Sequence, residues 1–187
     1  MKIAVFCGSN VGASEVYRAG AAALGRALAE QNIELVFGGT SKGLMKIVAD
    51  AVIDNGGVAH GVITRGLVDK GQQYDRLTIA EIVPTRALRK ARMAEVADGF
   101  VAMPGGIGTV EELFEMWVDA QFEGNLKPLG VYNLAGFFDH LLLFVDTMID
   151  CGFLPREQKN MIVVATDPHT LIERFRNHSP VTVSKWL

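Results

Sequence analysis

The sequence contains few cysteines and lacks any long apolar run. Its two cysteines, Cys7 and Cys151, match no metal-binding or redox spacing. We therefore expect reduced thiols in a cytoplasmic protein, with Cys151 buried. No stretch approaches the roughly 18 uninterrupted apolar residues of a transmembrane helix, and the apolar run from Ile3 to Cys7 is too short for the core of a signal peptide. No membrane partner is expected.

An excess of positive charge is also absent. The chain has 187 residues with 18 basic and 21 acidic side chains, a formal net charge of −3 and a pI near 5.8. This balance excludes a broadly basic surface for nucleic acid. Hydrophobic residues make up 49% of the chain, so it is not disordered. The length and the lack of repeats or linkers predict one domain over residues 1–187, with 178–187 as a tail.

Strand-like and helix-like segments alternate along the chain. This order predicts an α/β fold, a doubly wound parallel sheet with helices on both faces. The polar stretch Thr64 to Thr78 has no sustained period and predicts a loop over the edge of the sheet. Thr85 is expected to cap a helix. The expected strands are Lys2–Cys7, Glu34–Phe37, Val58–Ile63, Ile79–Val83, Gly99–Met103, Leu129–Tyr132 and Met161–Ala165, and the expected helices are Ser14–Gln31, Leu44–Asn55, Thr85–Ala97, Val110–Phe122, Phe137–Asp150 and Pro168–Arg176.

Three glycine-rich segments follow expected strands: Cys7–Ser14, Gly38–Gly43 and Pro104–Thr109. In an open parallel sheet, ligands bind beyond the carboxyl ends of the strands, and the amides at a helix start attract anions. Together the segments suggest a ligand that carries a phosphate, although the first alone is more typical of a simple turn. The GxGxxG pattern is missing from the first turn, and the GxxxxGK[ST] pattern is absent. These absences argue against a dinucleotide oxidoreductase and a P-loop ATPase.

Charged residues lie near the third segment. Glu111 and Glu112 follow it after Val110, and a carboxylate beside a phosphate is costly unless cations or ligand hydroxyls compensate. The preceding helix has Arg86, Arg89 and Lys90 on one side. Arginine suits bidentate contacts with phosphates or bases. The alternative interpretation is that the acidic pair and the basic residues each lie on a solvated helix face.

Four motifs occur in a fixed order along the chain. Pro104–Glu112 reads PGGIGTVEE and matches PGGxGTxxE, and Ala87–Met93 contains RKxxM. CGSN follows the first expected strand, and GGTSKGLM spans Gly38–Met45. With these motifs, residues 1–177 resemble the Lonely Guy (LOG) family of cytokinin riboside 5′-monophosphate phosphoribohydrolases, whose members are often labelled lysine decarboxylases in error.

The resemblance implies a Rossmann-like homodimer with an AMP nucleosidase type of activity. Such an enzyme cleaves the N-glycosidic bond of a purine nucleoside 5′-monophosphate and releases the free base and ribose 5-phosphate. The resemblance implies Arg89 and Glu112 as the catalytic pair, a site with residues from both subunits, and no metal or organic cofactor. The implied substrate-binding residues are Gly8, Ser9, Gly38, Gly39, Gly43, Met45, Lys90, Gly105, Gly106, Gly108, Thr109 and Glu111.

The chain departs from the family pattern at four places. Arg86-Ala87 stands where members often have Met-His, and Lys46 replaces the last glycine of GLMG. Thr64 replaces the proline of GVIP, and Gly71 lies near the position of a glutamate. These differences leave the base preference open between AMP and N6-prenylated AMP.

Two other functions stay open. One is a non-catalytic carrier or sensor of a phosphorylated ligand, such as the molybdenum-cofactor carriers that share a related glycine motif. The other is amino-acid decarboxylation, which would need a pyridoxal-binding lysine and is poorly supported at this length.

The helices expected to carry Arg89 and Glu112 have apolar residues around much of their surface. Such helices must bury more than one side, so we expect an isologous dimer that brings the active-site helices of two subunits together. Packing within the chain is the alternative. The residues are Leu88, Met93, Phe114, Met116, Trp117, Val118 and Phe122.

Overall fold

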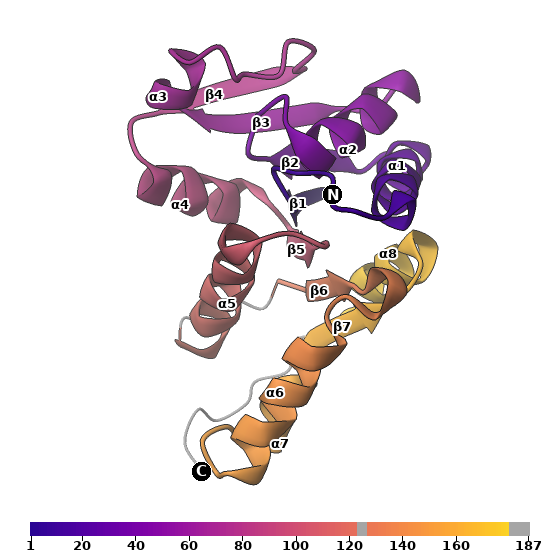
Figure 1. Cartoon of the computed structure of the whole chain (residues 1–187), viewed down its shortest axis with the longest axis vertical. Coiled ribbons are helices and arrows are strands. Elements are labelled where there is room, and N and C mark those ends of the chain that lie inside the picture. Colours follow the sequence, from indigo (N-terminus) through magenta and orange to yellow (C-terminus); the bar gives the residue numbers. More distant parts are fainter. Residues whose placement is uncertain (123–126, 180–187) are drawn as a thin grey trace.

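A seven-stranded parallel sheet forms the centre of the molecule (Figure 1). The computed structural model describes residues 1–122 and 127–179. The strand order β4-β3-β2-β1-β5-β6-β7 confirms the predicted doubly wound sheet. The strands are β1 (Lys2–Phe6), β2 (Glu34–Phe37), β3 (Ala59–Thr64), β4 (Ile79–Val83), β5 (Gly99–Ala102), β6 (Leu129–Tyr132) and β7 (Ile162–Ala165).

Helices cover both faces of the sheet. They are α1 (Glu15–Glu30), α2 (Gly43–Asp54), α3 (Arg65–Val68), α4 (Arg86–Val96), α5 (Ile107–Phe122), η1 (Leu134–Gly136), α6 (Asp139–Asp150), α7 (Arg156–Lys159) and α8 (Pro168–Arg176). Helices α1, α2 and α8 bury their apolar side chains against one face, and α4, α5 and α6 against the other (Figure 1). Each face therefore has its own apolar core.

Strand β1 lies at the centre of the sheet, between β2 and β5. Residues Ile3 to Phe6 are all buried, as expected for a strand covered on both faces. From β1 the chain winds outward through β2, β3 and β4, and then returns to continue on the other side from β5. This reversal leaves a crevice beyond the carboxyl ends of β1 and β5. The glycine-rich segments after β1, β2 and β5 lie at that edge.

Helix α4 starts as predicted, and α5 starts earlier. The Thr85 side chain accepts a hydrogen bond from Leu88 N at 3.2 Å, which confirms the expected cap. Helix α5 begins at Ile107 rather than at Val110. Because glycine disfavours a helix interior, the segment PGGIGT was predicted to lie outside the helix. Thr109 consequently lies in the first turn of α5.

The segment between β3 and β4 is more ordered than the predicted loop. It contains α3 and then folds back over the end of β2. Tyr74 fixes it, because its fully buried side chain donates from Oη to Asp50 Oδ1 at 2.8 Å. Its backbone N donates to Gly39 O at 2.9 Å. One buried aromatic residue, rather than a periodic pattern, sets this conformation.

Two expectations concern the C-terminal half. Cys151 is exposed at the end of α6, so the prediction that it is buried was wrong; it follows the last helical turn, beyond the apolar stripe. Residues 180–187 of the expected tail lie outside the described part of the chain.

None of the helices in the described part is long and apolar enough to cross a membrane. That the whole chain forms one domain stays a prediction.

Candidate active site

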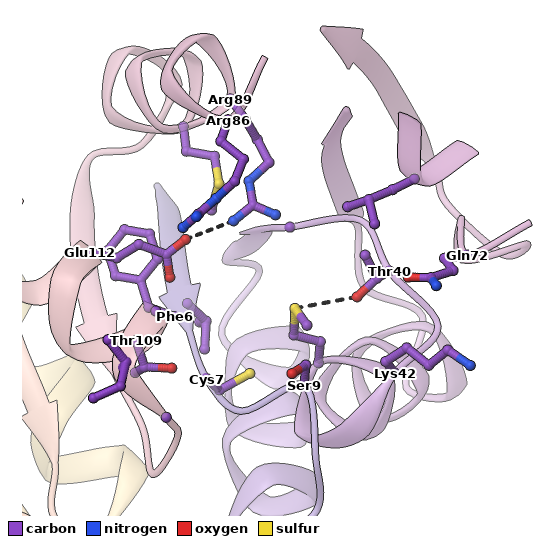
Figure 2. A pocket seen from close by; sticks show the side chains of 18 residues that line it. Phe6, Cys7, Ser9, Thr40, Lys42, Gln72, Arg86, Arg89, Thr109 and Glu112 are labelled. Atoms are coloured by element: carbon purple, nitrogen blue, oxygen red, sulfur yellow. Dashed lines mark hydrogen bonds and ion pairs between the residues drawn. The ribbon is translucent and has the colours of Figure 1, made fainter. Parts of the chain in front are cut away.

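A cavity of about 430 Å³ opens at the carboxyl end of β1 (Figure 2). Cys7 lies at its floor, and the side chains of α4 reach in from above. Figure 2 shows Glu112 and Thr109 on one side of this space and Thr40 and Gln72 on the other. The predicted site residues that line it are Ser9, Gly38, Met45, Arg89, Gly106, Gly108, Thr109 and Glu112.

The glycine-rich segments meet at this edge through their backbones. Gly8 N donates to Pro104 O at 3.1 Å, and Leu44 N donates to Gly8 O at 2.9 Å. Gly43 has a φ of +54°, and a Cβ at this position would lie 2.3 Å from the backbone carbon of Ser9. Only glycine fits there without movement of the backbone. The three segments are thus joined into one rigid edge.

The N-terminus of α5 borders the cavity. A Cβ at Gly106 or Gly108 would have no heavy atom within 4 Å, so a ligand can approach the backbone closely. The first amides of a helix lack partners within the helix, and together with the helix dipole they attract anions. Thr109, which is 4% exposed, lines the same space. This arrangement suits a phosphate group.

Arg89 and Glu112 form a buried ion pair in the cavity wall. Arg89 Nη2 donates to Glu112 Oε1 at 2.8 Å, and the two side chains are 13% and 10% exposed. Burial raises the pKa of Glu112 above its ordinary value, and the guanidinium of Arg89 opposes the rise. Arg89 Nε is buried without a hydrogen-bond partner in the described part of the chain. A Cβ at Gly38 would lie 3.0 Å from Arg89 Nη1, so a small residue at this position leaves room for the guanidinium.

The thiol of Cys7 is expected to be unreactive. Burial, with a contribution from the charge of Glu112, raises its pKa well above the usual range. A thiol that does not ionise is a poor nucleophile and a poor metal ligand. Within residues 1–122 and 127–179, no group of three or more His, Cys, Asp or Glu side chains is placed to hold a metal ion.

Six predicted substrate-binding residues do not line the main cavity. Lys90 Nζ pairs with Glu111 and, at 2.6 Å, with Glu115, which joins α4 to α5. A contact of Lys90 or Glu111 with a ligand stays a prediction. The remaining four are Gly39 and Gly43, which have positive φ in the turn after β2, and Gly8 and Gly105, which line a second cavity of about 170 Å³ that adjoins the first at Ser9 and Gly106.

Several lining residues were not among the predicted site residues. Thr40 and Lys42 belong to the glycine-rich segment Gly38–Gly43, and Leu67 and Gln72 come from the segment between β3 and β4. Ser41 N donates to Gln72 O at 3.0 Å, which ties this segment to the edge of the site. No local pattern indicated that it returns to the site, because the contacts depend on the tertiary fold.

All four departures from the family pattern lie within the described residues. Among them, Arg86 lines the cavity and the others do not. Lys46 instead pairs with Asp50 at 2.6 Å along α2. Thr64 ends β3, and Gly71 has a φ of +65° with open space around it. The departure that can touch a ligand is therefore an added cation.

The chain matches known proteins over most of its length. A family model described as "Possible lysine decarboxylase" matches residues 45–175. The protein named "Probable cytokinin riboside 5'-monophosphate phosphoribohydrolase LOGL2" of Oryza sativa subsp. japonica is 38% identical over 190 residues, 99% of this chain and 78% of its own length. "Cytokinin riboside 5'-monophosphate phosphoribohydrolase LOG5" of Arabidopsis thaliana is 38% identical over 182 residues, 96% of this chain and 79% of its own length.

Solved structures with the same fold include molybdenum-cofactor proteins. The molybdenum cofactor binding protein of Rippkaea orientalis has a TM-score of 0.71 and 20% identity, with 94% of this chain and 95% of that chain covered. The molybdenum cofactor carrier protein of Chlamydomonas reinhardtii has a TM-score of 0.69 and 24% identity, with 94% and 96% covered. At these identities the likeness shows the fold alone.

Proposed function

The chain belongs to the LOG family of cytokinin riboside 5′-monophosphate phosphoribohydrolases, and we propose that it hydrolyses the N-glycosidic bond of a purine nucleoside 5′-monophosphate. The substrate is AMP or an N6-modified AMP such as a cytokinin riboside monophosphate. The products are the free base and ribose 5-phosphate. We propose a cytoplasmic location and a homodimeric state.

One observation carries this proposal: the anion-binding start of α5 and the Arg89–Glu112 pair border the same cavity. Glu112 follows Gly108 by about one helical turn, which rises about 5.4 Å. In a nucleoside 5′-monophosphate the ribose separates the phosphate from the glycosidic carbon. A phosphate at the start of α5 therefore brings that carbon close to Glu112.

Glu112 acts on the sugar. Cleavage of the glycosidic bond develops positive charge on the ribose, and a carboxylate in a site poor in water stabilises this charge strongly. Glu112 also accepts hydrogen bonds from the ribose hydroxyls and orients the attacking water. These contacts explain why an acidic residue lies next to an anion-binding helix start.

Arg89 acts on the departing base. A guanidinium stays protonated in proteins, so Arg89 donates hydrogen bonds rather than a proton. These bonds stabilise the negative charge that develops on the purine. Arg89 lines the cavity, and its Nη2 is held by Glu112.

The acidic limb of the pH profile depends on Glu112. Because burial raises the pKa of this carboxyl, it takes up a proton at a higher pH than an ordinary glutamate. As the pH falls through the raised pKa, the stabilising charge is lost and kcat decreases. We expect kcat with saturating AMP to fall below a midpoint that lies above the ordinary glutamate range. A profile that stays flat down to that range would contradict this assignment.

The described lysines near the cavity do not support the decarboxylase alternative. A lysine that forms a Schiff base needs a lowered pKa in a desolvated pocket. Hydrogen bonds from Lys90 to Glu111 and Glu115 instead raise its pKa and keep it charged. Lys42 is exposed at the cavity. The carrier alternative leaves the buried Arg89–Glu112 pair without a role, although burying such a pair is costly.

The predicted dimer rests on the outer faces of α4 and α5. Met93, Met116 and Trp117 pack within the chain, whereas Leu88 and Val118 are 51% and 44% exposed. The side chain of Phe122, a further residue of this prediction, lies outside the described part. We expect activity to fall on dilution as subunits separate. Light scattering and turnover across one dilution series test this, and a fully active monomer of 20.3 kDa would contradict it.

A turnover screen tests the proposed function. AMP, isopentenyladenosine monophosphate, GMP and CMP are each incubated with the protein, and released base and ribose 5-phosphate are separated by HPLC. Release from the two adenine nucleotides supports the proposal, and their ratio gives the base preference. Tight binding of AMP without any release of base would instead support a carrier.

A further inference from the structure

Gln72 presents a free amide on the cavity wall opposite Glu112 (Figure 2). The residue is half-buried, and within the described part of the chain its side-chain amide makes no hydrogen bond. A primary amide both donates and accepts hydrogen bonds. When a ligand expels water from the cavity, this amide has to find its partners on the ligand. The position therefore suits a ligand whose edge carries a donor next to an acceptor.

The backbone of Gln72 is held on both sides. Its N donates to Leu67 O at 3.0 Å, and its O accepts a hydrogen bond from Ser41 N at 3.0 Å. The next residue, Gln73, forms an isolated antiparallel bridge with Thr40 in the turn after β2. The side chain of Gln72 thus starts from a fixed position at the cavity, although it belongs to a connection between two strands.

The other polar side chains of this wall do not offer the same contacts. Thr40 is 4% exposed, and its hydroxyl donates to Met45 Sδ at 3.5 Å. Lys42 is exposed and carries donors only. Leu67 and Met45 add apolar surface to the same cavity, which suits the face of a planar base. Gln72 is the side chain placed to recognise the edge of such a base.

The proposed substrate brings its base to this wall. A phosphate at the start of α5 and a ribose at Glu112 take up the α5 side of the cavity. Arg89 donates to Glu112 through Nη2, and its Nη1 would lie 3.0 Å from a Cβ at Gly38, so the guanidinium reaches from α5 to the end of β2. A base in contact with Arg89 therefore lies beside the end of β2, where Gln72 closes the cavity.

We propose that Gln72 is a specificity-determining residue that recognises adenine: its carbonyl accepts a hydrogen bond from the 6-amino group, and its NH₂ donates to the ring nitrogen beside that group. This inference rests on the proposed function and specifies the base of its substrate. Glutamine forms such a pair of bonds with adenine in other recognition sites. An adenine with one substituent on N6 keeps one N–H, so the contact extends to N6-modified AMP.

Gln72→Met tests the contact, because methionine has a similar length and no amide. The substrates are AMP and purine riboside 5′-monophosphate, which carries hydrogen in place of the 6-amino group. With AMP the variant loses two hydrogen bonds, and we expect kcat/KM to fall about 10-fold or more, the scale of a bidentate contact with a base. With the analogue it loses one bond, so the decrease should be several-fold smaller.

Gln73→Met is the matched control. Gln73 is an adjacent, half-buried residue of the same type that does not line the cavity. We expect this variant to hydrolyse both nucleotides like the wild type. Equal decreases for AMP and the analogue in Gln72→Met would show a structural role for this side chain and refute the proposal, as would wild-type kcat/KM with AMP.

Binding measured without turnover separates this inference from the proposed function. Calorimetry on Glu112→Gln, with and without Gln72→Met, gives dissociation constants for AMP and for the analogue. We expect tighter binding of AMP while Gln72 is present and loss of most of this preference in Gln72→Met. Equal affinity for both nucleotides with Gln72 in place would overturn the proposal even if the wild type hydrolyses AMP. If the preference depends on Gln72 and no nucleotide releases its base, the proposed function fails and the recognition of adenine stands.

Discussion

Replacement of Glu112 by glutamine should leave AMP binding nearly intact and slow its hydrolysis by at least about 100-fold, the scale for loss of a main transition-state contact. The glutamine keeps the size of the side chain and can still bond to Arg89 and to ribose hydroxyls. It lacks the charge that stabilises the developing cation on the sugar. Single-turnover kinetics with AMP, together with calorimetric binding, separate the chemical step from affinity.

Glu115→Gln is the matched control for this variant. Glu115 lies on α5 about one turn beyond Glu112 and pairs with Lys90 at 2.6 Å, and it does not line the cavity. Its replacement removes one negative charge from the same helix without touching the proposed chemistry. We expect turnover close to that of the wild type. Glu112→Gln with turnover similar to that of Glu115→Gln would remove Glu112 from the mechanism.

The architecture could be predicted because it follows from patterns that repeat along the chain. The continuous apolar run of β1 indicated a strand buried on both faces, and the alternation of strands and helices indicated a parallel sheet. The cap at Thr85 followed from residue type and position. Such features are local, so the sequence displays them directly.

Features that depend on one distant contact escaped prediction. The segment between β3 and β4 takes its path from Tyr74, whose partners Gly39 and Asp50 belong to other elements. The early start of α5 escaped because the low helix propensity of its glycines is overridden at the edge of the sheet. Cys151 was expected to be buried because of its apolar character, but the position just after the end of α6 is exposed.

The same division applies to the site. The motifs place Arg89 and Glu112 on facing helices, where the structure joins them at 2.8 Å. They did not reveal that Gln72 forms the opposite wall. Gln72 belongs to no motif, and it reaches the site because the segment between β3 and β4 folds back over the end of β2.

Adenosine should be a far poorer substrate than AMP, with kcat/KM lower by at least about 100-fold. Two charge-assisted hydrogen bonds to a phosphate, at about 1.5 kcal/mol each, already correspond to more than ~100-fold. The backbone at Gly106 and Gly108 is open to such a group, and the start of α5 attracts its charge. Binding of the phosphate holds the ribose against Glu112, so its loss lowers kcat as well as affinity. Initial rates of adenine release from both substrates give the comparison.

Thr109→Val locates the effect at this loop, because it removes a hydroxyl and nearly preserves the size of a buried side chain that lines the cavity. If Thr109 contacts the 5′-phosphate, the variant lowers kcat/KM for AMP and leaves the slow hydrolysis of adenosine unchanged. Thr147→Val is the control, since the Thr147 hydroxyl donates to Leu143 O on an exposed turn of α6. Equal losses for both substrates in Thr109→Val would show a structural role for this hydroxyl. Comparable kcat/KM for AMP and adenosine in the wild type would refute phosphate anchoring at the start of α5, since the anion site would then contribute nothing to catalysis.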